Sequence, residues 1–404
     1  MKKVVLSIMF LGVVVAPVPS RAATQEIVQP DGSLHHQFGW SVAVEGNTLV
    51  IGDPDYIRED MPCVKERGAV EIYSRVDGVW QRSQFFRYIG DGSARTRLGY
   101  SVAIKGNTII ASTPGQDFVG GGTTVLGAGA ISVYRRPSAT APFAFAGHAF
   151  APTPIQNGDF SSIWPVATNG LYMAATGFPS RPGDVEVYSL ANDAITHVST
   201  IATSLPLIAS LAITDQNVLV ATSGNDLTPV AYALNGTQAL TVDTSSLADT
   251  TSHQVSSLIA SGNTIAYVRK SNTSTLQQLV LAKLGANGIQ STQLTTLPSI
   301  GQDRLAQKVA MKEGEGIVID YSGLQSALLY VGGSYRNMGA LPDIAISTVS
   351  WSLAFSGTDL FLGEDVDHND PTQLCGRVGS VLVSRPLLGV RTALRMAPLA
   401  VLRN

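Results

Sequence analysis

Short apolar and polar segments alternate along this chain in a recurring order. Ser41–Val44 is a run of small and β-branched residues, Gly46-Asn47 follows, and Thr48–Ile51 is a second apolar run. A Gly-Asn pair tolerates the positive φ angles of a two-residue hairpin turn, so these residues predict two antiparallel strands. Residues 69–74 alternate with period two and predict a third strand, and residues 80–86 predict a fourth. The unit is therefore expected to be a four-stranded antiparallel meander.

The same unit returns along the chain. Residues 31–50, DGSLHHQFGWSVAVEGNTLV, align with residues 91–110, DGSARTRLGYSVAIKGNTII, and five weaker copies follow. The third position of the first strand recurs at residues 43, 103, 167, 212, 259, 310 and 354. A four-stranded propeller blade takes about 40–50 residues, whereas a sandwich pair would not repeat in this way and a β-helix would repeat at a shorter period. The pattern predicts an all-β fold, a seven-bladed β-propeller of four-stranded antiparallel blades.

The first two copies carry a family resemblance. Phe38-Gly39 with Gly52-Asp53-Pro54, and Leu98-Gly99 with Ser112-Thr113-Pro114, resemble the FG-GAP repeat of integrin α-subunits and of many secreted bacterial proteins. The resemblance is clear over residues 37–136 and can be traced to residue 384. It implies a propeller with an extracellular or periplasmic adhesion or ligand-binding role. The later copies lack the Phe-Gly pair, so the family's functional features are not carried over to them.

Two segments compete for the outer strand of the last blade. Residues 25–28 align with the end of the outer strand one repeat later, and residues 387–402 also contain a strand-like run. Either one would cover an edge that otherwise invites aggregation. The sequence leaves both possibilities open.

The two cysteines lie in equivalent loops of the first and last units. Cys63 precedes Gly68, and Cys375 precedes Gly379, in each case shortly before the third strand. The first and last units are neighbours in a closed ring, and secreted chains commonly pair such cysteines. A Cys63–Cys375 disulfide is therefore expected, worth up to about 4–5 kcal/mol in the chain-entropy model. A redox or metal-binding pair is the alternative, but there is no CxxC spacing.

The N-terminus reads as an export signal. Two lysines precede the apolar run Val4–Val15, and prolines and small residues lead to Ala22. We expect residues 1–22 to be a signal peptide cleaved after Ala22, leaving residues 23–404 as one propeller domain that is secreted or periplasmic. The alternative, a membrane anchor, would need a longer apolar run. The lysine-led leader favours a bacterial source, and no membrane insertion is expected after cleavage.

Composition narrows the possible partners. Charged residues make up only 14% of the chain, and 27 basic residues stand against 30 acidic ones. No cationic surface is implied, so nucleic acid is not an expected partner. There is no GxSxG, HExxH, P-loop or GxGxxG motif, and the six histidines are scattered. A protein or glycan partner, bound by a monomer, is the expectation.

One acidic segment could bind a cation. Asp365, Asp367 and Asn369 alternate in a predicted loop, and oxygen ligands of this kind suit Ca²⁺. Asp370 stands where a calcium loop needs glycine for its sharp turn, and Gln373 stands where a later carboxylate is expected. The segment is either a Ca²⁺ site or a solvated acidic loop.

The long loops after the second strands are the candidate binding face. In the first two units they contain Asp53, Asp55, Tyr56, Asp117 and Phe118. Loops on a rigid scaffold commonly carry binding function, and aromatic side chains there could stack on a sugar or a peptide. The alternative is that the acidic loops only keep the protein soluble.

Two functions compete. The first is a non-enzymatic binding or adhesion module that uses the long-loop face. The second is a propeller enzyme, a glycan hydrolase or lyase with its site at the central channel. Carboxylates or a histidine at the channel mouth would favour the enzyme. The inner strands read as Ser, Val, Ala and Ile with few ionisable groups, which favours the binding module.

Overall fold

The computed structural model describes the chain in separate ranges. They are residues 24–28, 37–56, 68–88, 96–157, 165–176, 182–223, 228–234, 239–247, 253–255, 257–271, 276–297, 308–312, 316–321, 326–331, 334–340, 350–356, 359–366 and 378–384.

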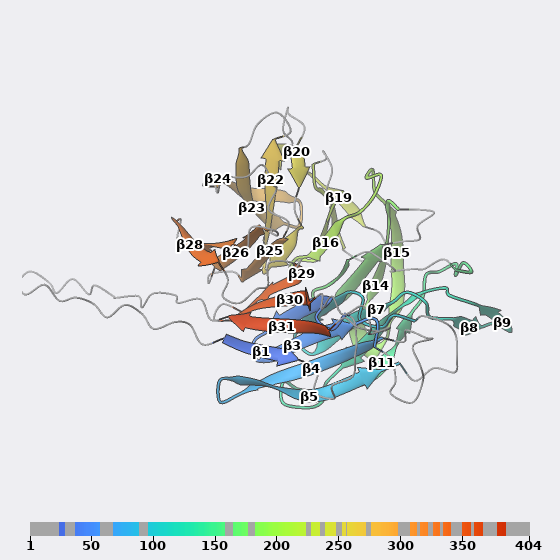
Figure 1. Cartoon of the computed structure of the whole chain (residues 1–404). Helices are drawn as coiled ribbons and strands as arrows, with labels where there is room; N and C mark the ends of the chain where they lie inside the picture. Colours follow the sequence, from blue (N-terminus) through green and yellow to red (C-terminus); the bar gives the residue numbers. More distant parts are fainter. Residues whose placement is uncertain are drawn as a thin grey trace, which may run out of the picture.

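Strands dominate these ranges, and most of them form antiparallel sheets of four or five strands (Figure 1). Sheet 1 contains β2(Ser41–Glu45), β3(Thr48–Asp53), β4(Ala69–Val76) and β5(Val79–Arg87). Sheet 2 contains β6(Val102–Lys105), β7(Thr108–Thr113), β10(Ala130–Arg135) and β11(Ala144–Ala149). Sheet 3 contains β12(Val166–Thr168), β13(Tyr172–Thr176), β14(Asp184–Ser189) and β15(Thr196–Ala202). Sheet 4 contains β16(Ser210–Ile213), β17(Val218–Thr222), β18(Val230–Ala233) and β19(Leu240–Val242).

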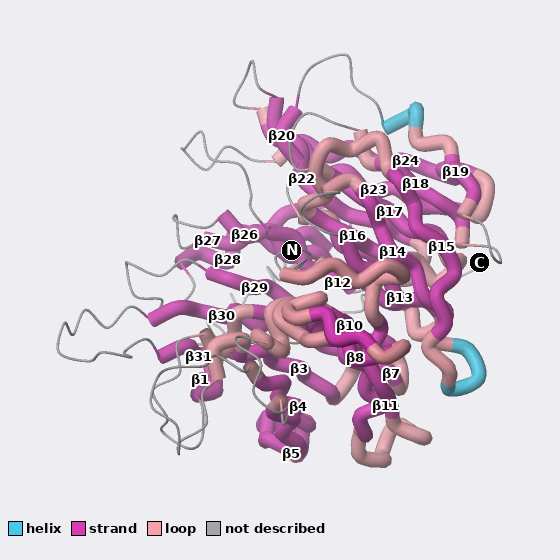
Figure 2. The backbone as a smooth tube through the Cα atoms, turned by 90° about the vertical axis from the view of Figure 1, so that its right-hand side faces the viewer, coloured by secondary structure: helices cyan, strands magenta, loops and turns pink. Residues whose placement is uncertain are grey.

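The remaining strands continue the series. Sheet 5 contains β20(His253–Val255), β21(Ile259–Ser261), β22(Thr264–Ser271), β23(Gln277–Gly285) and β24(Gly288–Thr296). Sheet 6 contains β25(Lys308–Lys312), β26(Gly316–Tyr321), β27(Ser326–Val331) and β28(Ser334–Ala340). Sheet 7 contains β29(Ser350–Phe355), β30(Leu360–Val366), β31(Val378–Ser384) and β1(Thr24–Val28). A small hairpin, β8(Phe118–Gly120) and β9(Thr123–Val125), and two 3-10 turns, η1(Ala191–Asp193) and η2(Ser245–Leu247), complete the described elements (Figure 2).

The sheets close into a ring. Each inner strand contacts the inner strand of the next sheet, in the order β2, β6, β12, β16, β21, β25 and β29, and β29 contacts β2 again. The apolar core lies between adjacent sheets, as where Leu49 of sheet 1 and Phe361 of sheet 7 share one cluster. The predicted all-β propeller of four-stranded antiparallel sheets is confirmed.

The N-terminal segment supplies the outer strand of the last sheet. β1 pairs antiparallel with β31, from Thr24 opposite Ser384 to Val28 opposite Ser380. This pairing settles the competition with the C-terminal tail at that position, and residues 387–402 lie outside the described ranges. Because β1 precedes sheet 1 and pairs within sheet 7, the start of the chain helps to hold the ring closed.

A repeated glutamine contact shows that β1 takes a regular outer-strand position. The Gln25 side chain donates to Trp80 O at 2.8 Å and accepts from Trp80 N at 3.0 Å. Gln84 of β5 makes the same two bonds to the backbone of Phe143, at 2.8 and 2.7 Å. The contact from sheet 7 to sheet 1 therefore repeats the contact from sheet 1 to sheet 2.

Serines at the start of the inner strands join neighbouring sheets. Ser41 Oγ donates to Gly99 O at 2.7 Å, and Ser352 Oγ donates to Gly39 O at 2.8 Å. A Cβ at Gly52 would collide with the same Gly99 oxygen, so only glycine allows this close approach. Further serine bonds join Ser101 to Val166, Ser210 to Leu258 and Ser257 to Val309.

Candidate functional site

The inner strands enclose a cavity of about 480 Å³ on the ring axis. Alanine recurs at the third position of these strands and leaves the axis open. The alanines that line the cavity at this position are Ala43, Ala103, Ala167, Ala212, Ala310 and Ala354. Sheet 5 has Ile259 there, and Met311 and Phe355 add larger apolar surface. The cavity is large enough for a small ligand or for one group of a larger partner.

The two faces of the ring differ. We call the face that carries the turns between the first and second strands, such as Gly46-Asn47, the turn face. We call the opposite face, where β3 ends at Asp53 and the long loops begin, the loop face. An inner strand such as β2 runs from the loop face at Ser41 to the turn face at Glu45.

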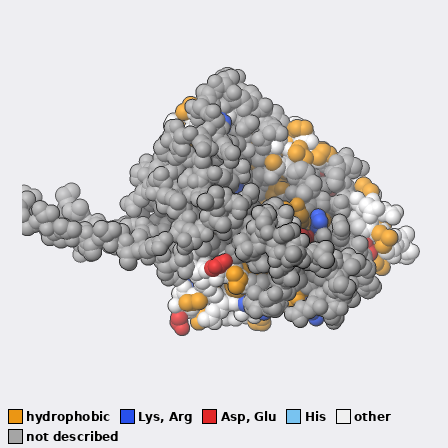
Figure 3. Space-filling model, viewed as in Figure 1, with side chains coloured by type: hydrophobic (Ala, Val, Ile, Leu, Met, Phe, Trp, Pro, Cys, Tyr) orange, Lys and Arg blue, Asp and Glu red, His pale blue; other side chains and the backbone are white. Residues whose placement is uncertain are grey.

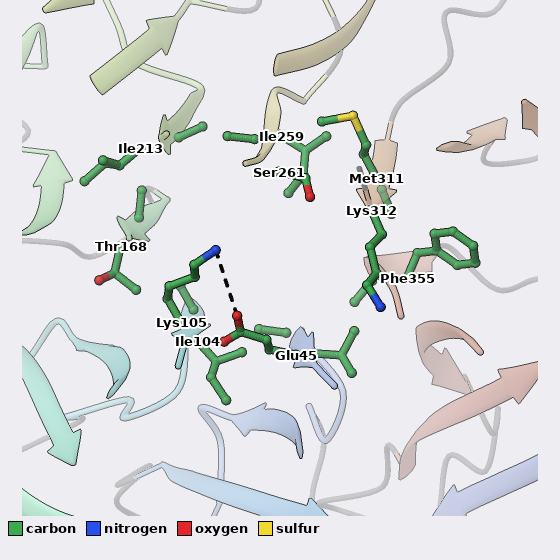
Figure 4. Close-up of a pocket in the computed structure, with 18 of the residues that line it drawn as sticks. Glu45, Ile104, Lys105, Thr168, Ile213, Ile259, Ser261, Met311, Lys312 and Phe355 are labelled. Atoms are coloured by element: carbon green, nitrogen blue, oxygen red, sulfur yellow. Dashed lines mark ion pairs between the residues drawn. The ribbon is translucent and has the colours of Figure 1, made fainter. Parts of the chain in front are cut away.

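Charged side chains gather at the turn-face mouth of the cavity. They are Glu45 at the end of β2, Lys105 at the end of β6, Asp215 shortly after β16 and Lys312 at the end of β25. Figure 4 shows Glu45, Lys105 and Lys312 around this opening. On the face drawn in Figure 3, hydrophobic side chains and a few charged ones of the described residues reach the surface.

Lys105 joins the two carboxylates. Its Nζ lies 2.9 Å from Asp215 Oδ1 and 3.9 Å from Glu45 Oε1. Glu45 Oε2 also accepts a hydrogen bond from the backbone N–H of Gly106. Across the opening, Lys312 Nζ donates to Ser356 O at 3.2 Å. The mouth thus offers ammonium donors and carboxylate acceptors side by side.

These ion pairs can exchange with a ligand. The side chains of Lys105, Glu45 and Asp215 are 35%, 38% and 47% exposed. Ion pairs with this much exposure contribute only about 0–1 kcal/mol to stability, because water screens them. A ligand group that displaces one partner of such a pair therefore costs the protein little stability. It also gains a direct contact with the charge that remains.

The cavity wall adds backbone groups. Each inner strand is an edge strand of its own sheet, so one side of its backbone faces the axis. Apolar side chains with interspersed backbone donors and acceptors suit an amphipathic or hydroxylated group. Among the described residues, no three His, Cys, Asp or Glu side chains are placed to hold a metal ion.

Part of the predicted binding face is buried. Asp53 is 0% exposed, Asp55 is buried, and Tyr56 is 5% exposed with its ring 5.0 Å from that of Phe85. The chain turns directly after β3, with Tyr56 N donating to Asp53 O, and this turn places the Tyr56 ring against Phe85 of sheet 1. The sequence predicts exposed loop positions here, whereas Asp53 is the last residue of the buried strand β3 and Tyr56 lies in the turn that follows it.

The second loop lies nearer the surface. Asp117 Oδ1 accepts from Gly127 N at 2.7 Å, which fixes the base of the β8–β9 hairpin. The Phe118 ring lies 5.2 Å from that of Phe150 and is half-buried. A binding role for Asp117 and Phe118 stays a prediction.

The other predicted site residues are only partly covered. Asp365 lies in β30, where its backbone pairs with Gly379, so it belongs to a strand and not to the predicted loop. The expected Ca²⁺ ligands Asp367 and Asn369 lie outside the described residues, as do Cys63 and Cys375. The Ca²⁺ site and the disulfide therefore stay predictions.

Sequence reasoning missed the charged mouth. One signal was available, because Glu45 and Lys105 occupy the same repeat position, directly before the glycine of the turn. The repeat pattern gave no such signal for Asp215. This residue follows β16 of sheet 4, whereas Lys105 ends β6 of sheet 2, and sheet 3 lies between these two sheets in the ring.

The comparisons with known proteins agree with this architecture. Residues 22–70 match the FG-GAP repeat family. The fold is similar to that of catalytically inactive virginiamycin B lyase from Staphylococcus aureus, solved with quinupristin, with a TM-score of 0.53, 8% identity, and coverage of 89% of this chain and 98% of that one. It is also similar to U3-55K, with a TM-score of 0.52, 14% identity, and coverage of 90% and 98%. No curated protein matches the sequence.

These findings define the class of protein. The chain is a β-propeller that carries an FG-GAP repeat at its N-terminal end. At 8% and 14% identity, the likeness to the solved structures concerns the fold alone.

Proposed function

We propose that this protein is an exported binding module whose turn-face mouth receives a polar group of a protein or glycan partner. One observation carries the proposal, namely an open axial cavity with two carboxylates and two ammonium groups at its rim. A ligand site usually consists of a mainly apolar cavity on which a small number of polar groups converge. The FG-GAP repeat supports the same role through its resemblance to adhesion proteins.

The rim suits a group that carries both hydrogen-bond donors and acceptors. Lys105 and Lys312 favour a carboxylate or hydroxyl oxygen, whereas Glu45 and Asp215 favour an amine or a hydroxyl hydrogen. The rim is neutral overall, so a highly charged partner gains little from it. Amino acids, chain termini and sugars with acidic or amino groups fit these requirements.

Export is part of the proposal. The lysine-led leader of residues 1–22 supports cleavage after Ala22. Among the described residues, no helix is long and apolar enough to cross a membrane.

Thermal unfolding with a panel of ligands tests the binding site. The panel contains amino acids, uronic acids, amino sugars and short neutral oligosaccharides, added to the mature chain. A ligand at 100 times its dissociation constant adds about 2.7 kcal/mol, which raises the midpoint by several degrees for a chain of this size. We expect Lys105→Ala and Asp215→Asn to abolish the shift, because each removes a rim group.

One control and one further cavity variant accompany these substitutions. Lys283→Ala removes an exposed lysine of β23 and should leave the shift intact. Lys312→Ala removes the other ammonium group of the rim and should weaken binding. A ligand shift that survives all three cavity variants would contradict the proposed site.

A second candidate function is a glycan hydrolase or lyase at the same mouth. The observation that favours it is the pair of carboxylates, Glu45 and Asp215, on either side of Lys105. Paired carboxylates can serve as acid and base in glycoside cleavage. Release of reducing ends from glycans, lowered at least about 100-fold by both Glu45→Gln and Asp215→Asn, would establish it. Binding without turnover would leave the binding module.

A further inference from the structure

The loop-face ends of the inner strands, which we call the loop-face mouth, carry aromatic side chains. Trp40 stands directly before β2 and Tyr100 stands two residues before β6, at the ends of these strands that lie away from Glu45 and Lys105. Their ring centroids are 5.0 Å apart, and the ring planes are inclined by 55°. Both side chains are half-buried. Two neighbouring sheets thus present a joined aromatic surface at their loop-face ends.

Both residues are inserted outside the strand ladder. Gly99 N donates to Ser112 O at 3.0 Å, and Ser112 N donates to Ser101 O at 2.9 Å. Ser112 thus bonds to the residues before and after Tyr100, and Tyr100 itself is the extra residue between them. Trp40 has the same place in sheet 1, because Gly39 N donates to Gly52 O and Gly52 pairs with Ser41. An inserted residue of this kind redirects a side chain, and such bulges are frequent beside functional sites.

The neighbouring sheet 7 repeats the insertion. The register of β29 shifts between Ser350 and Ser352, which leaves Trp351 as the extra residue. The inner strands β29, β2 and β6 contact one another in turn. Three consecutive sheets therefore insert one residue at this mouth, and the residue is aromatic each time.

The fold itself does not require these aromatic residues. In sheet 4, Ala209 N donates to Thr222 O and Thr222 pairs with the next residue, Ser210, so nothing is inserted. Ala209 is exposed, which shows that the chain before this inner strand faces solvent. An aromatic ring that keeps part of its surface in water adds less to stability than one in the core.

The core positions of the same turns are filled by other residues. Phe38 is 1% exposed and Leu98 is 2% exposed, two positions before Trp40 and Tyr100. The hydrophobic packing of these turns is thus supplied without the inserted residues. A role in contacting a ligand accounts for aromatic side chains at positions where packing does not need them.

Two charged groups act on the Tyr100 side chain. Burial raises the pKa of Tyr100, the positive charge of Arg97 lowers it, and the negative charge of Asp55 raises it, so both charges act at the Tyr100 ring. Asp55 is buried, so the half-buried Arg97 guanidinium is the one of these two groups that a ligand can reach. An aromatic face with a guanidinium near it matches a sugar ring, which has an apolar C–H face and hydroxyl oxygens that accept hydrogen bonds. A cationic ligand fits less well, because Arg97 would repel it.

We propose that Trp40 and Tyr100 form a saccharide-binding subsite at the loop-face mouth, in which a sugar ring stacks on the aromatic surface and hydroxyls bond at its edge. This site lies beyond the one proposed above. Glu45 lies five positions after Trp40, or about 16 Å along the strand at about 3.3 Å per residue. The two mouths can therefore be tested separately.

Binding of the mature protein to an array of neutral and uronic-acid oligosaccharides tests this site, followed by calorimetry with the strongest binder. We expect Trp40→Ala and Tyr100→Ala each to weaken that binding at least about 10-fold, in line with the roughly 1–3 kcal/mol of an aromatic stacking contact. Trp40→Phe should restore most of the affinity. Phe145→Ala removes an aromatic side chain on β11 that is 52% exposed, and it should have no effect.

Several outcomes would overturn the subsite. These are no oligosaccharide bound at millimolar concentration, binding unchanged in folded Trp40→Ala and Tyr100→Ala, or binding of tetramethylammonium in place of sugars. Lys105→Ala separates the two proposals. If it abolishes oligosaccharide binding while Trp40→Ala does not, the subsite is wrong and the turn-face site stands.

Discussion

At the scale of single residues, burial sets the chemistry of the outer strands. His148 of β11 accepts or donates a hydrogen bond at Nδ1, 3.1 Å from Ser132 Oγ, and the ring of Phe145 lies 4.8 Å from its imidazole. Desolvation by burial lowers the pKa of His148 to about 4. The imidazole is therefore neutral in the folded protein at pH values where it is charged in the unfolded chain.

This histidine should make stability depend on pH. Between pH 6.5 and about pH 4 the unfolded chain binds a proton that the folded chain does not, so stability falls as the pH is lowered through this window. At 1.36 kcal/mol per pKa unit, reduced for partial solvent contact, the loss is roughly 2–3 kcal/mol. The free energy of unfolding in urea should be measured at pH 7 and at pH 4 for the unmodified protein and for His148→Gln. The decrease from pH 7 to pH 4 should be smaller in the variant by this amount. An equal loss in both proteins would contradict the assignment.

At the scale of elements, closure of the ring depends on a strand contributed from the other end of the chain. The local pattern of β1 resembles that of the C-terminal tail, so sequence alone left two candidates. The pairing with β31 and the contact of Gln25 with Trp80 show that β1 occupies the outer position of sheet 7.

The glutamine contacts give a matched pair of variants. Gln25→Ala and Gln84→Ala each remove two hydrogen bonds to a neighbouring outer strand. At roughly 0.5–1.5 kcal/mol for each bond, each variant should lower the free energy of unfolding by about 1–3 kcal/mol in urea. Gln81→Ala, at an exposed position of β5, is the control. A loss for Gln84→Ala alone would show that β1 does not hold sheet 7 to sheet 1.

At the scale of the whole molecule, a covalent link is expected across the same junction. The chain leaves β3 of sheet 1 and β30 of sheet 7 at the loop face, and the two sheets are neighbours through β2 and β29. Cys63 comes after β3 in the sequence and Cys375 comes after β30. Because these strands end on the same face of neighbouring sheets, we predict that the two cysteines pair.

Mass spectrometry of the purified protein without reductant should show a mass lower by two hydrogens and a peptide linking Cys63 to Cys375. Because the bond closes a long loop, its reduction should cost up to about 4–5 kcal/mol of stability. Cys63→Ser, Cys375→Ser and the double variant should be destabilised equally. Two thiols that react in the native protein would rule the bond out.

The sequence by itself determined the unit and its repetition. Period-two alternation, Gly-Asn turns and the recurring Ser-Val-Ala pattern act over a few residues, so they predict strands such as β2 and β3 and the propeller that their copies build.

Only the tertiary structure decided which side chains meet. Glu45, Lys105 and Asp215 come from three sheets and reach one another because the ring closes, and Asp53 and Tyr56 are buried because the chain turns directly after β3. The insertion of Tyr100 becomes visible only from the bonds of Ser112 on either side of it. Such contacts join residues far apart in the chain or depend on the register between strands, and local sequence patterns carry no information about either.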